Sequence, residues 1–173
     1  MSAGWGQWYT MGNLAPSGRL LVLAGSNLDE TTVYGFGRDR YHRDGSHLGL
    51  QGAGYRLFAQ DMSLDPRREA EEKVFPWEHP IEPLTRAMVL ADKTLFVAGP
   101  VDVLTAEDSV AAWEGREGGL LWAVSSKSGE KQAEYLLDAP PVFDGLIALP
   151  GRLVFSTTDG CVVSFAPQHG DAP

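Results

Sequence analysis

The sequence contains a single cysteine, Cys161, among its 173 residues. One cysteine cannot form an internal disulfide, and the sequence has no CxxC pair or cysteine–histidine cluster that could hold structural zinc. Cys161 lies in the alternating apolar run DGCVVSF, which predicts a small buried residue of a strand. No cationic residue is adjacent to it in sequence, so we do not expect a reactive thiol.

Cationic residues are few as well. The chain has 14 Lys and Arg against 23 Asp and Glu, for a formal net charge of −9. This balance argues against a general nucleic-acid binder or a binder of anionic membranes, because both require an attractive positive field. No apolar run approaches the roughly 20 residues of a membrane span. The start, MSAGWGQWYTMGNL, lacks a positive region followed by an apolar one, so we expect no export signal in it.

Sustained helical periodicity is also missing. The best helical stretch is TAEDSVAAWEGRE, residues 105–117, where Thr105 is the expected N-cap and Asp108 its capping-box partner. Elsewhere short apolar runs rich in Val, Leu, Phe and Tyr alternate with glycine- and proline-containing turns. This pattern predicts an all-β chain with one short helix near 105–117.

The short strands recur as a loose repeat. Each repeat has an apolar strand, a tight polar turn, a second apolar strand, a connection and a third apolar strand. The repeats start roughly 60 residues apart, a spacing typical of arrays or propellers. They are LLVLAGSNLDETTVYGFG with YRLFAQD, AMVLADKTLFVAG with GLLWAVSSKSG, and LIALPGRLVFSTTDGCVVSFAP.

The third strands place a small residue at their centre, at Ala59, Ala123 and Ser164. A fourth strand is expected at 130–137 after the second repeat and near 71–77 after the first, where Pro76 weakens it. Tandem four-stranded antiparallel units are the blades of a β-propeller. The predicted fold is therefore a partial β-propeller of about three four-stranded blades, with approximate bounds 15–80, 84–138 and 139–167.

The stretch LWAVSSKSGEKQAEY resembles the repeat of the pyrroloquinoline-quinone-like propeller family. Ala123 and Gly129 match the family pattern, whereas Ser125 stands at its usual Asp and Ala133 at its usual Trp. In the family this Trp docks on the next blade, so the resemblance implies that the second repeat lacks that contact. The first repeat keeps Ala59 and Asp61, and DGLIALPGRLVFSTTDGCVVSF also looks like a blade.

The likeness is greatest to the C-terminal blades of large exported bacterial propeller proteins. The resemblance therefore implies a periplasmic or secreted location and a chain that is a fragment of a longer propeller. Three blades do not close a ring, because propellers typically have four to eight. We expect the remaining blades of a longer chain, a protein partner or further copies of the chain to complete the assembly.

The segment RDRYHRDGSH is the most functional-looking in the sequence. Its Arg38, Arg40, His42, Arg43 and His47 are candidate binding residues. The His-x4-His spacing could bind a metal, but no third fixed ligand is evident, and we expect a solvated polar loop. His79, between prolines in PWEHP, is expected in a structural linker. We predict no catalytic, cofactor-binding or metal-binding residue and no cofactor.

The connections 38–54 and 100–118 both join the second strand of a repeat to its third, which predicts that they lie on one face. The first is basic, and the second is acidic through Asp102, Glu107, Asp108, Glu114 and Glu117. We expect them to pack against each other. The predicted function is a non-catalytic scaffold that binds a protein or ligand. The alternative is a fragment of a quinone-dependent dehydrogenase-like or sugar-processing enzyme whose active centre lies in missing blades.

Overall fold

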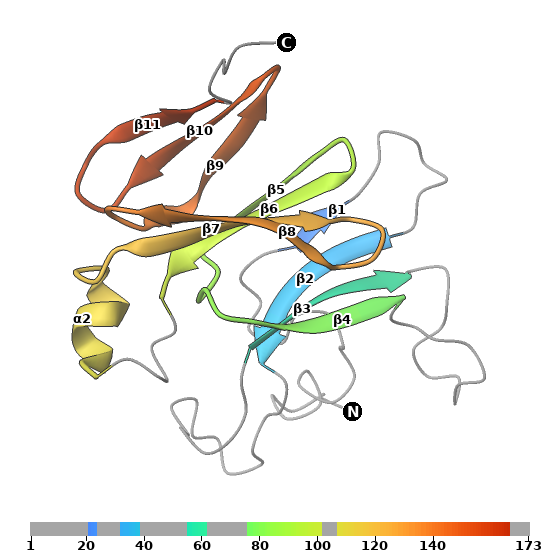
Figure 1. The fold of residues 1–173 in the computed structure, drawn as a ribbon, viewed down its shortest axis with the longest axis horizontal. Coiled ribbons are helices and arrows are strands. Elements are labelled where there is room, and N and C mark those ends of the chain that lie inside the picture. The colour runs from blue at the N-terminus through green and yellow to red at the C-terminus, as the bar shows by residue number, and fades with distance from the viewer. Residues whose placement is uncertain (1–20, 24–31, 39–54, 62–75, 102–106, 167–173) are drawn as a thin grey trace, which may run out of the picture.

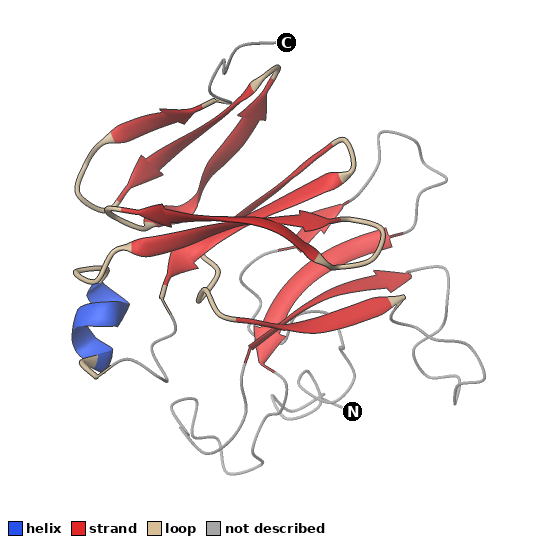
Figure 2. Ribbon diagram, in the orientation of Figure 1, coloured by secondary structure: helices blue, strands red, loops and turns tan. Residues whose placement is uncertain are grey.

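The computed structural model describes residues 21–23, 32–38, 55–61, 76–101 and 107–166. Their strands form three antiparallel sheets, and their only helix is short (Figures 1 and 2). The prediction of an all-β chain with a short helix within 105–117 is confirmed.

The first sheet has the order β1-β2-β3-β4, so that each strand pairs with the next along the chain. Its strands are β1 (Leu21–Leu23), β2 (Thr32–Arg38), β3 (Tyr55–Asp61) and β4 (Trp77–Ile81). Residues 71–75 of the expected fourth strand lie outside the described residues, and the described strand begins after Pro76, where Trp77 pairs with Ala59 in the ladder with β3. Proline has no N–H to donate to such a ladder.

The second sheet has the order β5-β6-β7-β8. Its strands are β5 (Ala87–Ala91), β6 (Thr94–Pro100), β7 (Gly119–Ser125) and β8 (Lys131–Leu137). A turn at Asp92 and Lys93 joins the first two, and Asp92 adopts a φ of 52°, a left-handed conformation that aspartate tolerates. The predicted fourth strand at 130–137 is confirmed.

The third sheet has the order β11-β10-β9. Its strands are β9 (Pro141–Leu149), β10 (Arg152–Thr157) and β11 (Val162–Phe165). None of the other described strands pairs with the second edge of β11, so this sheet has three strands where the others have four. Cys161 lies in the turn before β11 and is exposed, so the prediction of a buried strand residue is wrong.

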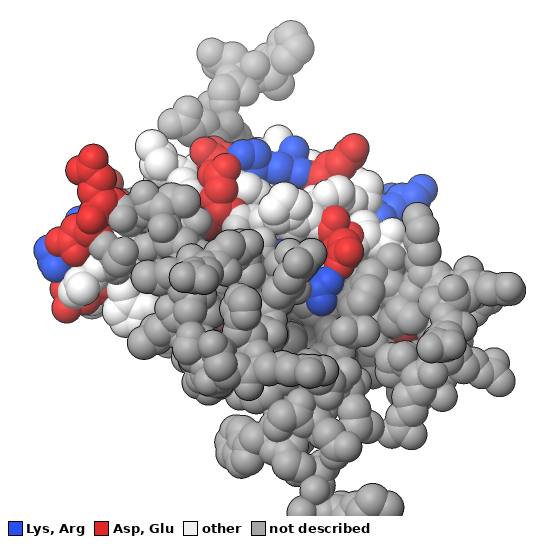
Figure 3. Space-filling view, turned by 90° about the horizontal axis from the view of Figure 1, so that it is seen from below, with Lys and Arg blue, Asp and Glu red and all other residues white. Residues whose placement is uncertain are grey.

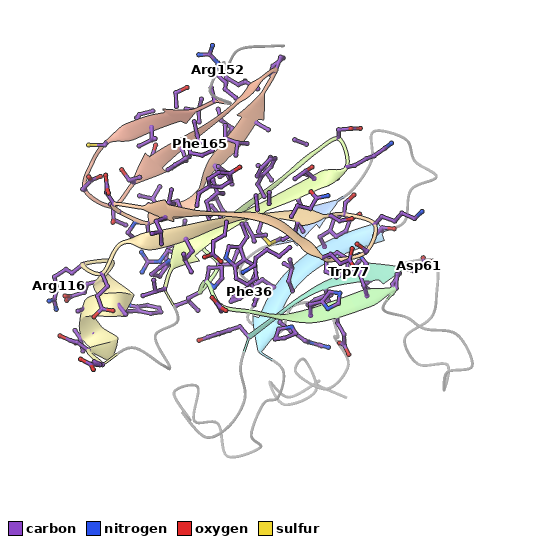
Figure 4. All side chains as sticks on the ribbon, viewed as in Figure 1. Phe36, Asp61, Trp77, Arg116, Arg152 and Phe165 are labelled. Atoms are coloured by element: carbon purple, nitrogen blue, oxygen red, sulfur yellow. The ribbon has the colours of Figure 1, made fainter. Side chains whose placement is uncertain are left out.

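The sheets form layers, with the second sheet in the middle (Figure 1). Alternate side chains of β7 face opposite neighbours: Trp122 packs toward the first sheet and Leu121 toward the third. Because a strand in a middle layer is buried on both faces, its sequence is apolar at consecutive positions. Figure 4 shows Phe36 and Trp77 between the first and second sheets, and Phe165 on the third.

The first strands of the three sheets lie side by side, with β1 next to β5 and β5 next to β9. Where the second and third sheets meet, the backbone N–H of Asp144 donates to the carbonyl of Arg86 at 3.1 Å. The face of the third sheet that points away from the second is open. Ile147, Leu149 and Val162 are 53%, 48% and 72% exposed there.

Candidate functional site

The helix α2 (Ser109–Glu114) lies in the connection between β6 and β7. Its N-cap is Asp108 rather than Thr105, which lies outside the described residues. The Oδ1 of Asp108 accepts from the backbone N–H groups of Val110 at 3.0 Å and Ala111 at 2.9 Å. The backbone bond from Ala111, together with that from Val110, lowers the pKa of the Asp108 carboxyl, because both bonds favour its charged form.

The other end of α2 is fixed against the second and third sheets. Gly115 ends the helix with a φ of 82°, and a Cβ at that position would overlap the ring of Pro140, which leads into β9. Only glycine combines this left-handed conformation with so close an approach. The helix is therefore held at both ends, and Ala111 and Ala112 on its inner side are buried.

Arg86 connects α2 with the third sheet. Its side chain is 6% exposed, and its guanidinium lies 5.7 Å from the centre of the Trp113 ring and 5.4 Å from that of Phe143. It also donates a hydrogen bond from Nη2 to the carbonyl of Trp113, one of the last carbonyls of α2. A cation at this end of a helix is favourable, and the two rings add cation–π attraction.

The two rings held by Arg86 are themselves open to solvent. Trp113 is 45% exposed and Phe143 is 52% exposed; Val110, one helical turn before Trp113, and Val142, next to Phe143 in sequence, are exposed as well. We call these four residues the α2–β9 surface. An exposed tryptophan and phenylalanine on rigid elements are typical of a binding surface rather than of a stabilising core.

Carboxylates accompany the α2–β9 surface. The exposed acidic residues on α2, beside its two ends and next to Phe143 are Glu107, Asp108, Glu114, Glu117 and Asp144. The one cation of the described stretch 107–117 is Arg116, which pairs with Glu114 at 2.8 Å. Figure 3 shows mainly acidic side chains at its left edge, the side on which α2 lies in Figure 1. The described part of this connection is therefore acidic, as its sequence indicates.

The predicted binding residues of the first connection fall mostly outside the description. Arg38 is the last residue of β2, and its backbone pairs with Tyr55 at the start of β3. Arg40, His42, Arg43 and His47 lie outside the described residues, so their predicted roles stay predictions. Within the described stretches, no three His, Cys, Asp or Glu side chains come together in a way that could hold a metal ion.

At the opposite end of the strands, Trp77 locks the first sheet to the second. Its Nε1–H donates to the carbonyl of Ser126 at 2.9 Å, and its ring lies against Gly129 in the turn between β7 and β8. Gly129 has a φ of 74°, and a Cβ there would overlap the rings of Trp77 and His79. This role of Trp77 is not predicted from the sequence. The available signal was the Ser-Gly turn, because a glycine permits both a positive φ and the close approach of another group.

His79 lies in a strand and not in a linker, so that part of the prediction is wrong, whereas the structural role expected for it is confirmed by this contact. It is the middle residue of β4, where its backbone pairs with Leu57. Its Nε2 lies 2.9 Å from the carbonyl of Ser128, and its ring stacks on that of Trp77 with centres 6.0 Å apart. A carbonyl only accepts hydrogen bonds, so Nε2 carries the proton in this arrangement.

The turn that holds Cys161 is organised by Asp159. The hydroxyl of Thr157 donates to Oδ1 of Asp159, and the backbone N–H of Cys161 donates to the same oxygen at 3.3 Å. The Thr157 bond, with that from Cys161, lowers the pKa of the Asp159 carboxyl. These bonds close the turn between β10 and β11.

No protein-family model matches the chain, and no curated protein matches it. None of the described helices is long and apolar enough to cross a membrane. The α2–β9 surface is therefore interpreted from its own chemistry. Half-exposed rings over a buried cation, among carboxylates, are groups suited to recognition of another molecule.

Proposed function

We propose that this chain is a non-catalytic β-propeller segment that serves as a binding scaffold, with the connections 38–54 and 100–118 on one face. The observation that carries the proposal is the side-by-side arrangement of β1, β5 and β9, each the first strand of a four- or three-stranded meander. Strands placed in this way are typical of blades around an axis. The likeness to the pyrroloquinoline-quinone-like repeat supports the same proposal.

The contact of Trp77 with Gly129 gives further support. It joins the outermost strand of the first sheet to the outer turn of the second, where the resembled family places its docking tryptophan. In this proposal the open face of the third sheet, with Ile147, Leu149 and Val162, meets a further blade of a longer chain or of a partner.

The two ends of the strands can be told apart. The backbone N–H of Ser126 donates to the carbonyl of Lys93 at 2.9 Å, so the turns 92–93 and 126–128 share one end. Gly115 and Thr158 lie together near Pro140 at the other. A seven-residue strand spans about 23 Å, and this length separates the two ends. The connections 38–54 and 100–118 should therefore be close to each other and far from residue 93.

The test is a pair of distances measured by spin labels in a Cys161→Ser background. Labels at Arg43→Cys and Arg116→Cys should lie closer together than labels at Arg43→Cys and Lys93→Cys. A shorter distance to position 93 would overturn the shared face. Scattering or dispersion data on the labelled chain confirm that it stays folded.

The alternative of a quinone-dependent enzyme fragment has its own readout. The scaffold proposal expects no change in visible absorption when pyrroloquinoline quinone and Ca²⁺ are added to the full chain. A saturable spectral change, followed by oxidation of an added sugar or alcohol, would favour the enzyme and contradict the scaffold.

A further inference from the structure

The α2–β9 surface has features that a core would not require. Val110 and Trp113 are three residues apart and lie on one side of α2, while Ala111 and Ala112 on the other side are already buried. Val110 is 60% exposed and Trp113 is 45% exposed, although small buried alanines are sufficient to seat the helix. Val110 therefore adds nothing to the described packing of this helix, and Trp113 keeps nearly half of its surface open beyond its contact with Arg86.

The surface is also rigid before anything binds. Arg86 holds the ring and the carbonyl of Trp113 and the ring of Phe143, while Asp108 and Gly115 fix the two ends of α2. Preorganised aromatic side chains lose little conformational freedom on binding. Tryptophan is also the residue most enriched among those that dominate binding energy at protein interfaces.

The charges around the surface select the partner. Its exposed carboxylates are Glu107, Asp108, Glu114, Glu117 and Asp144, whereas Arg116 already pairs with Glu114. Such a field repels acidic partners and attracts basic ones, and its effect is largest at low ionic strength. A partner that carries an apolar side chain beside a cation would complement both the exposed rings and the carboxylates of this surface.

We propose that the α2–β9 surface docks a polypeptide segment in which lysine or arginine stands next to an apolar side chain. In such a complex, the apolar side chain packs on Trp113 and Phe143 while the cations face Glu117 and Asp144, the carboxylates beside the pair of Arg116 with Glu114. This inference rests on the proposed binding scaffold and adds the class of its partner.

The test uses the full chain and three short synthetic peptides of equal length. One alternates lysine with leucine, one alternates glutamate with leucine, and one alternates lysine with serine. We expect the lysine–leucine peptide to bind with a Kd of about 10–100 µM at low salt, the range of weak peptide recognition. The other two should bind at least about tenfold more weakly, because each lacks one of the two complementary features.

Two variants locate the binding, and one controls for it. Trp113→Ala and the double variant Glu114→Lys, Glu117→Lys should each weaken binding of the lysine–leucine peptide by about tenfold or more. Ile147→Ser is the matched control, because Ile147 is 53% exposed but lies on the open face of the third sheet. Binding should be unchanged in this control.

Several outcomes would overturn the inference. One is equal binding of the glutamate–leucine peptide. A second is loss of binding in Ile147→Ser but not in Trp113→Ala, which would move the site to the third sheet. A third is binding that appears only after Arg40→Glu and Arg43→Glu, which would make the chain's own connection the occupant. Saturable binding of cellohexaose at Trp113 without peptide binding would assign the surface to carbohydrate.

The proposed function and this inference fail separately. If the distance between positions 43 and 116 is short but no peptide binds, the scaffold stands and the partner class is wrong. If the peptide binds while position 43 lies nearer to position 93, the docking surface stands and the shared face of the two connections is wrong.

Discussion

The ring of Trp77 occupies the space that any side chain at Gly129 would need, so a residue of the first sheet determines which residue the second sheet can carry in its turn. The indole N–H bond to Ser126, at 2.9 Å, holds the ring in place. Trp77 and Gly129 are far apart in sequence, and their contact matches two consecutive sheets to each other at one glycine.

Replacing Gly129 with alanine should destabilise the fold in two ways. An L-residue at a φ of 74° costs about 1–2 kcal/mol, and overlap with Trp77 adds about 1–3 kcal/mol. Gly151→Ala is the control, because Gly151 has the same φ of 74° and nothing lies within 4 Å of its would-be Cβ. Urea unfolding measures both variants, and equal losses would contradict the tight contact with Trp77.

Trp77→Phe should weaken the junction of the first two sheets. The variant loses the donor to Ser126 and part of the buried ring area, a loss of about 1–3 kcal/mol in the free energy of unfolding. Trp113→Phe changes the same residue type at a site that is 45% exposed, and should cost less than about 1 kcal/mol. If both variants lose the same amount in urea unfolding, Trp77 has no special role in the junction.

Acid should loosen the start of α2. The backbone N–H bond from Ala111, with that from Val110, keeps the folded pKa of Asp108 below its unfolded value. The cap therefore stabilises the helix above the unfolded pKa of about 4, and this stabilisation is lost as the pH falls through the folded pKa. The amide signals of Val110 and Ala111, followed by NMR against pH, should shift in this acid range.

Asp108→Asn provides the control for that titration. Asparagine caps helices as well as aspartate does but has no carboxyl to protonate. The amide signals of the variant should lose the acid transition and keep their neutral-pH positions. A transition that persists unchanged in the variant would mean that another group causes it.

Arg86→Met should release α2 from the third sheet. The variant keeps much of the buried volume but removes the cation from between two rings and the donor to the carbonyl of Trp113, a loss of about 2 kcal/mol. Arg86→Lys should restore less than half of this, because an ammonium group is a point charge without a planar fork. The ring signals of Trp113 and Phe143 report the release, and full rescue by lysine would contradict the need for the guanidinium plane.

Much of the fold could be read from local patterns. The consecutive apolar residues of β7 indicate burial on both faces, and the turns at Asp92 and Gly151 are marked by residues that accept a positive φ. The N-cap was harder, because Thr105 and Asp108 are both good caps and only the Asp108 bonds to Val110 and Ala111 decide between them.

The contacts between elements had no comparable signal. Arg86 donates a hydrogen bond to Trp113, which lies 27 residues later in the chain, and nothing near Arg86 in the sequence indicates this contact. Trp77 likewise meets Ser126 across 49 residues. Cys161 was misplaced because the alternation of DGCVVSF continues through a turn, and the sequence does not show that Asp159 begins it.

The open third sheet makes the chain prone to aggregate at high concentration. β11 combines a hydrogen-bonding edge that no described strand occupies with Val162 at 72% exposure, and such an edge templates addition of another strand. Two partners then compete for this edge: the further blade that would cover the third sheet, and β11 of a second copy of the chain. The rate of encounter between two copies rises with the square of their concentration. Expression at low concentration and fast docking of the further blade would therefore favour the complete fold over fibrils.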